Sequence, residues 1–267
     1  MFLADCHTHS ICSPDGHIPM VEMAKTAYEY GLSNLTLTDH ADLLDLEGCF
    51  TPDFDWEPLD YQREQMLRAY GTKLDLPMGI EFGMGFLDPE ASRKILSHPG
   101  LDFVIGSVHN ISRENGGGDF YFLPYETTED CYRALDDYFD SMLKLARGEF
   151  YDVVGHIIYP LRYMDGDFPP PTLSRYWDTI REIMRLAIES GRGIEINTWK
   201  GNTLKEWLPL LKLYKELHGE IITVGSDAHA TAPIGRGVKA AYSMMQDCGF
   251  RYVAAYHERK PEMIRLK

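Results

Sequence analysis

Seven short apolar segments alternate along this chain with longer segments of helical periodicity, and this order is what most constrains the fold. Short apolar runs separated by amphipathic stretches are typical of βα units, in which each strand of a parallel sheet is followed by a helix. The predicted strands span residues 2–6, 34–38, 78–82, 102–107, 152–155, 193–197 and 221–225, with a candidate eighth at 252–256.

The predicted helices fill the intervals between these strands, and several begin at a Pro or Thr and end near a Gly. They span residues 19–30, 58–70, 89–97, 128–147, 173–190, 203–217 and 238–247. Residues 41–57 are predicted to form a long loop rich in acidic and aromatic residues. Seven or eight such units in 267 residues predict one α/β domain over residues 1–267, built as a closed or nearly closed barrel. An open doubly wound sheet is the alternative, but no GxGxxG or GxxxxGK[ST] motif follows the first strand.

The charge and composition of the chain limit the kinds of molecule that it is expected to bind. The formal net charge of −15 disfavours a nucleic-acid partner, which would require a basic face. It does not exclude an anionic substrate, because bound metal ions can reverse the sign of the charge locally. No apolar run approaches the ~18–20 residues of a membrane span, and the N-terminus does not read as a secretory signal. Five scattered cysteines without a CxxC pair are typical of reduced thiols, so the expected location is cytoplasmic.

The residues at the ends of the predicted strands are nearly all imidazoles and carboxylates. In chain order they are Asp5, His7, His9, Asp39, His40, Glu81, His109, His156, Asp227 and His229. In a parallel barrel all these strand ends lie on one rim, where barrel enzymes keep their active sites. A single histidine at a strand end is usually structural, but six strand ends that each supply such groups favour a shared site. Imidazoles mixed with carboxylates suit Zn, Mn or Fe, and one zinc takes about four ligands, so the set predicts two or three divalent ions.

The same motifs, taken in order and spacing, resemble the polymerase and histidinol phosphatase (PHP) superfamily. They are DCHTHS at 5–10, TDH at 38–40, Glu81, SVH at 107–109, GH at 155–156 and SDAH at 226–229. Further features resemble the histidinol-phosphatase branch: SPDG at 13–16, Arg162 with its neighbouring tyrosine, EINT at 195–198 and ERKP at 258–261. The resemblance covers nearly the whole chain and implies a distorted (β/α)7 barrel, similar to a TIM barrel, with three metal ions at the carboxyl ends of the strands.

Carried over position by position, the resemblance implies the ligands of each ion. The first ion would be held by His7, His9, Glu81 and Asp227, the second by Glu81, His109 and His156, and the third by His40, His229 and one residue of the loop after His9. Many members of the superfamily have a histidine at the position of Asp15. A carboxylate can also bind a metal, so Asp15 is the expected ligand, with His17 as the alternative.

The implied activity is hydrolysis of a small phosphate monoester, with L-histidinol phosphate as the expected substrate and histidine biosynthesis as its setting. A hydroxide that bridges the first two ions would attack phosphorus. Asp227 and His229 are the expected catalytic residues, with Asp227 as proton donor to the leaving oxygen. Arg162 is expected to bind the phosphate, with a surface arginine that pairs with an acidic residue as an equal alternative. Where the family often has a phosphate-binding arginine after EINT, this chain has Lys200, which would supply a point charge.

Other functions fit some of the same residues. A PHP phosphoesterase acting on nucleotides or oligonucleotide ends would keep the chemistry and change the substrate. A degenerate PHP module that binds a partner would be expected to have lost metal ligands, whereas the set here is intact. An amidohydrolase barrel also uses HxH on its first strand, but it usually bridges its metals with a carboxylated lysine, and Glu81 fits that role here. The oligomeric state stays open.

Overall fold

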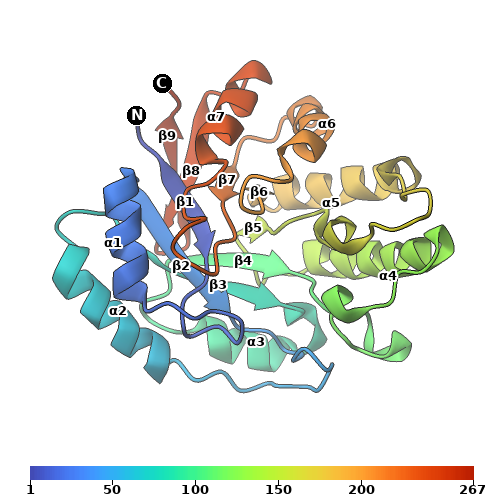
Figure 1. The fold of residues 1–267 in the computed structure, drawn as a ribbon, viewed down its shortest axis with the longest axis horizontal. Coiled ribbons are helices and arrows are strands. Elements are labelled where there is room, and N and C mark those ends of the chain that lie inside the picture. The colour runs from blue at the N-terminus through green and yellow to red at the C-terminus, as the bar shows by residue number, and fades with distance from the viewer.

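The computed structural model describes residues 1–267, and its centre is one sheet of seven parallel strands in sequence order (Figure 1). Each strand pairs with the next one along the chain, as repeated βα units predict. The strands are β1 (Ala4–Thr8), β2 (Asn34–His40), β3 (Met78–Gly83), β4 (Phe103–Ser107), β5 (Val153–Val154), β6 (Gly193–Asn197) and β7 (Ile222–Gly225).

The sheet closes into a barrel at the seam between its first strand and the segment that follows β7. There the backbone N–H of Asp227 donates to the carbonyl of His7 over 2.9 Å, and the N–H of His9 donates to the carbonyl of Ala228 over 2.8 Å. Thr8 and Ala228 form a parallel bridge at this seam. The expected (β/α)7 barrel is therefore confirmed. The seam includes the strand-end residues His7, His9 and Asp227.

Seven helices surround the barrel, so that the sheet lies at the centre of the molecule (Figure 1). They are α1 (Met20–Tyr30), α2 (Glu57–Tyr70), α3 (Pro89–Leu96), α4 (Thr128–Arg147), α5 (Trp177–Glu189), α6 (Leu204–Glu216) and α7 (Val238–Asp247). Local sequence explains their ends. Thr127 and Asp130 form a reciprocal capping box at the start of α4, and Gly31 ends α1 in the left-handed conformation (φ 85°).

The end of the barrel where the strands begin is closed by a hairpin that the sequence predicts only in part. Its first strand, β8 (Tyr252–His257), matches the candidate eighth strand, but it pairs antiparallel with β9 (Lys260–Arg265) and not with the barrel. Ala254 and Tyr256 of β8 pack with the barrel residues Ala4, Cys6, Phe103, Ile105 and Val153. The strand β9 was not expected, because KPEMIR is mostly polar and holds a proline.

An ion pair fastens this hairpin to the barrel. Arg259 Nε donates to Asp152 Oδ2, which also accepts the backbone N–H of Val104, at the start of β4, over 2.8 Å. Replacing Arg259 by alanine leaves the buried carboxylate without its cation, so we expect the free energy of unfolding to fall by about 1–3 kcal/mol. Urea denaturation measures this loss. Arg265→Ala, on exposed β9, is the matched control, and an equal effect of both substitutions would contradict the assignment.

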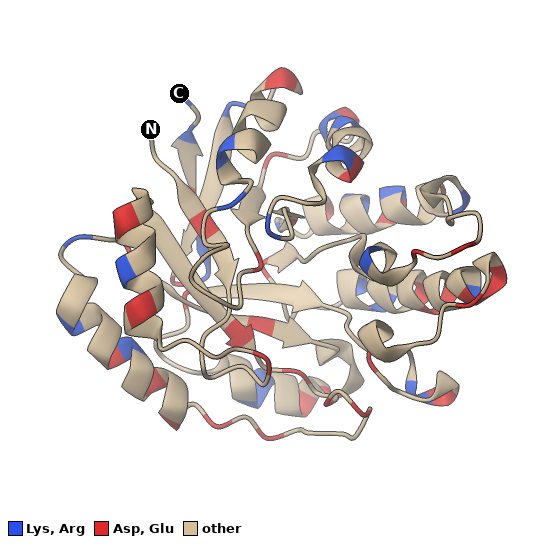
Figure 2. Ribbon diagram, in the orientation of Figure 1, with Lys and Arg blue, Asp and Glu red and all other residues tan.

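Charged residues of both signs are interspersed along the helices, and in this view no element is basic throughout (Figure 2). This distribution agrees with the acidic composition. None of the helices combines the length and the apolar composition that crossing a bilayer would need.

Candidate metal centre

All nine side chains that the sequence predicts as metal ligands lie together at the carboxyl end of the barrel. Histidine and carboxylate atoms from β1, β2, β3 and the loops after β1, β4, β5 and β7 approach one another in overlapping groups. Apart from Asp227, these residues fall into groups in which the ligand atoms lie within 4.8 Å of one another. The topology therefore gathers residues that are as far apart in sequence as His7 and His229.

The first group is formed around His7 and His9 of β1 and its following loop. Their Nε2 atoms lie 3.0 Å apart, and Glu81 Oε2 lies 3.1 Å from the first and 3.4 Å from the second. Asp227 Oδ1 approaches the same two nitrogens at 3.7 and 3.5 Å. Asp227 has a left-handed backbone (φ 58°) in the turn after β7, which aims its carboxylate at the seam of the barrel.

The second group shares Glu81 with the first. Glu81 Oε1 lies 2.6 Å from His156 Nε2 and 3.0 Å from His109 Nε2, and these two nitrogens are 3.2 Å apart. One oxygen of Glu81 thus faces each group. Ser107 donates to Oε1 over 2.7 Å and helps to fix the carboxylate. This arrangement fits the bridging role that the family resemblance implies for Glu81.

The third group is more open to solvent. Asp15 Oδ2 lies 2.8 Å from His229 Nε2, and Asp15 Oδ1 lies 3.8 Å from His40 Nε2. The ring of His9 stacks on those of His40 and His229, with centroids 4.4 and 4.2 Å apart. His17, the alternative ligand, is exposed and belongs to none of the groups. Of the two candidates, Asp15 is therefore the one that the loop brings to the imidazoles.

The donor atoms fit divalent cations. Ligands about 2.0–2.2 Å from a tetrahedral zinc lie roughly 3.3–3.6 Å from one another, close to the separations in the first two groups. His7, His9, Glu81 and His156 are almost completely buried, and burying so many titratable groups is costly without a partner of opposite charge. Burial, with His229 and His40 beside it, lowers the pKa of His9 to about 3, so its imidazole is neutral and has a free lone pair.

Arg162, expected to bind phosphate, lies beside the first group. It follows the loop after β5, in the 3₁₀ helix η4 (Tyr159–Tyr163), and its side chain is 4% exposed. Its Nη1 donates to Asp227 Oδ2 over 2.7 Å, while the rings of Tyr159 and Trp199 lie 5.3 and 5.5 Å from its guanidinium carbon. Its Nε is buried and has no partner. The arginine therefore pairs with an acidic residue, but it is buried and not the surface residue of the alternative, and it keeps one buried N–H group free.

Lys200 lies in the turn that follows β6. Its backbone is left-handed (φ 59°), and its N–H donates to the carbonyl of Ser226 over 2.7 Å. Its side chain forms no hydrogen bond or ion pair with the groups described above. The structure brings Lys200 to the same rim but does not join it to them.

Two carboxylates of the site were not expected from the sequence. Glu195 Oε1 lies 2.6 Å from His7 Nδ1, and its Oε2 accepts the backbone N–H of His156 over 3.0 Å. Asp42 contacts the Nδ1 atoms of His40 and His109, each at 3.2 Å. A carboxylate in the apolar strand GIEIN is a recognisable signal for Glu195, whereas Asp42 is one acidic residue among several in its loop.

The strand-end aspartates Asp5 and Asp39 accept hydrogen bonds from backbone N–H groups, and Asp39 also accepts them from serine hydroxyls. Asp39 accepts from Ser13 Oγ over 2.7 Å, and Ser13 Oγ lies 3.1 Å from His9 Nδ1. Asp5 accepts the backbone N–H groups of Ser226 and Gly235 and so holds the loop after β7. Asp39 can thus help to orient the His9 imidazole through Ser13, whereas Asp5 forms no hydrogen bond with an imidazole.

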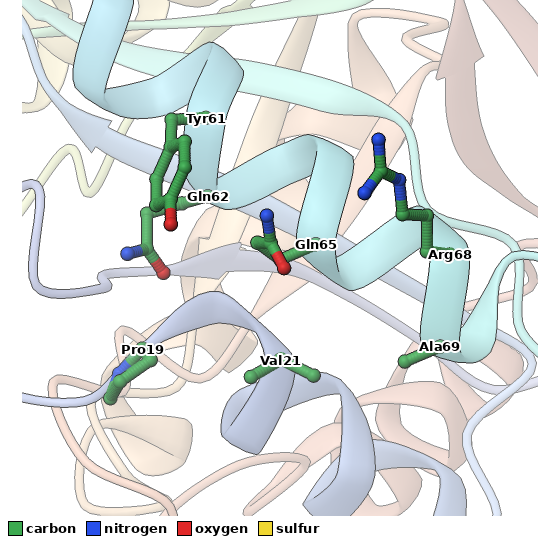
Figure 3. A pocket seen from close by; sticks show the side chains of 7 residues that line it. All are labelled: Pro19, Val21, Tyr61, Gln62, Gln65, Arg68 and Ala69. Carbon is green, nitrogen blue, oxygen red and sulfur yellow. The ribbon is translucent and has the colours of Figure 1, made fainter.

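A surface hollow of about 530 Å³ lies elsewhere, between α1 and α2 (Figure 3). Its lining residues are Pro19, Val21, Tyr61, Gln62, Gln65, Arg68 and Ala69. No histidine, cysteine or carboxylate lines it.

Comparison with known proteins agrees with this geometry. Residues 5–199 match the family described as PHP domain. A protein of Clostridium acetobutylicum named probable histidinol-phosphatase is 29% identical over 257 residues, which cover 93% of this chain and 95% of that protein. A protein of Lactococcus lactis named histidinol-phosphatase is 25% identical, with 96% of this chain and 95% of that protein covered.

The fold matches a solved structure over almost its full length. The crystal structure of histidinol phosphate phosphatase from Lactococcus lactis, complexed with zinc, L-histidinol and phosphate, superimposes with a TM-score of 0.82. The alignment covers 97% of this chain and 98% of that one at 25% identity.

Proposed function

This chain belongs to the PHP family, and on that premise we propose that it is a metal-dependent phosphatase that hydrolyses L-histidinol phosphate to L-histidinol and phosphate. One observation carries the proposal. An intact set of nine imidazole and carboxylate side chains lies on one barrel rim, in a fold of which 97% superimposes on a histidinol phosphate phosphatase complexed with zinc, L-histidinol and phosphate.

We assign the ligands to three divalent ions, with zinc as the first choice and manganese or iron as alternatives. His7, His9, Glu81 and Asp227 would hold the first ion, and Glu81, His109 and His156 the second. Asp15, His40 and His229 would hold the third. The ions, when bound, supply Lewis acidity that neutralises phosphoryl charge and activates water at neutral pH.

The residues of the chain orient this chemistry. Glu195 accepts the Nδ1 proton of His7, which leaves Nε2 of that ring as the ligand atom. Asp227 uses Oδ1 toward the first group and Oδ2 toward Arg162 and Asn197. We propose that the Asp227 carboxylate, which is ionised beside Arg162, takes a proton from the attacking water and delivers it to the leaving alcohol. His229, 22% exposed, donates from Nδ1 to the backbone carbonyl of Asp227 over 3.1 Å, with Oδ1 3.8 Å away, so we propose that it holds the turn that carries this carboxylate.

Arg162 is the residue that we propose to grip the phosphate, with Lys200 as a second positive charge on the rim. The free buried N–H of its Nε supports this role. Replacing Arg162 by alanine should raise KM for histidinol phosphate and lower kcat/KM about 10- to 100-fold, the range for one hydrogen bond to a charged group. Steady-state phosphate release measures it. Arg185→Ala is the control, because Arg185 forms an exposed ion pair with Glu189 on α5. An unchanged kcat/KM in Arg162→Ala would show that Arg162 does not bind the phosphate.

The proposed function is tested by a substrate panel on metal-loaded protein. We expect phosphate release to be fastest with histidinol phosphate, compared with other small monoesters, nucleoside monophosphates and oligonucleotides. His9→Ala, which removes a ligand shared by two groups, should fold but lose metal and activity. If nucleotides or oligonucleotide ends were hydrolysed faster, they and not histidinol phosphate would be the substrate. If metal-loaded protein hydrolysed none of the esters, the proposal that it is a phosphatase would be excluded.

A further inference from the structure

Asp42 occupies a position between two of the proposed metal groups. Its Oδ1 lies 3.2 Å from Nδ1 of His109, a member of the second group, in hydrogen-bonding geometry. Its Oδ2 lies 3.2 Å from Nδ1 of His40, a member of the third group. Each oxygen of one carboxylate therefore faces Nδ1 of a different histidine, and the proposed assignment gives the other nitrogen of that ring, Nε2, to an ion.

The site of this carboxylate is built by the backbone of β3. Ala41 N–H donates to the carbonyl of Glu81 over 2.8 Å, and Leu43 N–H donates to the carbonyl of Gly83 over 3.1 Å. These bonds hold Asp42 from both sides. Gly83 leaves the room that the carboxylate fills, since a Cβ at this position would come 1.7 Å from Asp42 Oδ1 and 2.7 Å from its Cγ. Asp42 is thus fixed relative to the bridging Glu81, two residues before Gly83.

The chemistry of imidazole gives this position a consequence. An imidazole that donates Nδ1–H to a carboxylate keeps its Nε2 lone pair for a metal, and its ring is held in orientation. Nε2 of His109 faces Glu81 and His156, and Nε2 of His40 faces Asp15. Nδ1 of His40 is buried and has no aligned hydrogen bond, and the carboxylates nearest to it are Asp42 and, at 3.4 Å, Glu81. A rotation of the His40 ring toward Asp42 would align the hydrogen bond between Nδ1 and Oδ2, which already lie 3.2 Å apart.

We propose that Asp42 is a positioning residue that couples the second and third metal groups, so that an ion bound at one prepares the other. The inference rests on the proposed metal-dependent function. An ion that orients His109 also orients the shared carboxylate, and the carboxylate then orients His40. Because coupling of two binding equilibria is reciprocal, an ion at the third group strengthens binding at the second by the same factor.

The test is a zinc titration of the apoprotein, followed by competition with a chelator and by metal analysis of dialysed samples. Asp42→Asn replaces two acceptor oxygens by one acceptor and one NH₂ donor, so it can no longer accept from both rings. We expect zinc affinity at the second and third groups to fall about 10- to 100-fold and their cooperativity to disappear, while the first group keeps its ion. Asp53→Asn, an exposed aspartate in the same loop, is the matched control.

A second variant moves the carboxylate without removing it. Gly83→Ala should displace Asp42 from between the rings and reproduce the zinc-binding defect of Asp42→Asn. Gly118→Ala is its control, because a Cβ there meets no atom within 4 Å. Far-UV circular dichroism checks that each variant is folded. Cobalt-substituted protein gives an independent signature, since the visible absorption of ions at the second and third groups should change in both variants.

The outcomes separate this inference from the function on which it rests. Zinc binding in Asp42→Asn and Gly83→Ala with wild-type affinity and cooperativity would overturn the inference alone. A zinc-soaked crystal with an Asp42 oxygen about 2.0–2.2 Å from an ion would make Asp42 a ligand and would also overturn it. Wild-type protein that binds no zinc and releases no phosphate would overturn both the inference and the proposed function.

Discussion

Phosphatase activity should fall by at least about 1,000-fold when Glu81 is replaced by glutamine. Glu81 faces the Nε2 atoms of His7, His9, His109 and His156 at 2.6–3.4 Å, and one oxygen serves each of the first two groups. The amide keeps the volume but carries no negative charge and offers an NH₂ donor in place of one oxygen. Loss of the bridge would remove several kcal/mol of charge stabilisation in the transition state, and each 1.36 kcal/mol is a factor of ten in rate.

The measurement is kcat/KM with histidinol phosphate, together with the metal content of the purified variant. Glu90→Gln, on the exposed side of α3, is the control for the same chemical change. Full activity in Glu81→Gln would show that the two groups do not share this carboxylate as ligand.

Removal of metal by a chelator should abolish activity and also lower the melting temperature. The apoprotein keeps a cluster of buried imidazoles and carboxylates without their cations, so any ion that binds the folded state stabilises it. At a free zinc concentration of 100 times Kd, each ion adds about 2.7 kcal/mol, which corresponds to roughly 5–11 °C for a chain of this size. Calorimetry with and without added zinc measures the shift.

Zinc returned to the chelated protein should restore both activity and melting temperature. His9→Ala should show a much smaller thermal shift, because this imidazole belongs to the first and third groups. Equal melting temperatures of apoprotein and zinc-treated wild type would argue that the rim groups do not bind the ion.

The order of apolar runs along the sequence was enough to predict the seven barrel strands and the rim on which the histidines gather. The strand boundaries were less accurate at β1, which was expected at residues 2–6 and spans Ala4–Thr8. The register shifts there, so that the three steps from Asp5 to Thr8 match two steps on β2, from Leu35 to Leu37. Strict alternation of side chains cannot predict such a shift, because it depends on hydrogen bonds to a strand about thirty residues away.

The parts of the site that escaped prediction depend on contacts across the barrel. Asp42 gains its position from Gly83 on a neighbouring strand, and nothing in its own loop distinguishes it from Asp45 or Asp53. Similarly, the pairing of Arg162 with Asp227 joins the loops after β5 and β7. Sequence spacing identifies residue types suited to an ion, whereas the groups that orient those residues are selected by the fold.

The hairpin of β8 and β9 and the proposed metal site lie at opposite ends of the barrel. The hairpin closes the end where the strands begin, next to both chain termini (Figure 1), while the imidazoles lie at the opposite end. An affinity tag, a surface anchor or a fused partner attached at either terminus would therefore project away from the mouth through which an ester enters. Immobilised or fused forms of this protein should keep the turnover of the free protein.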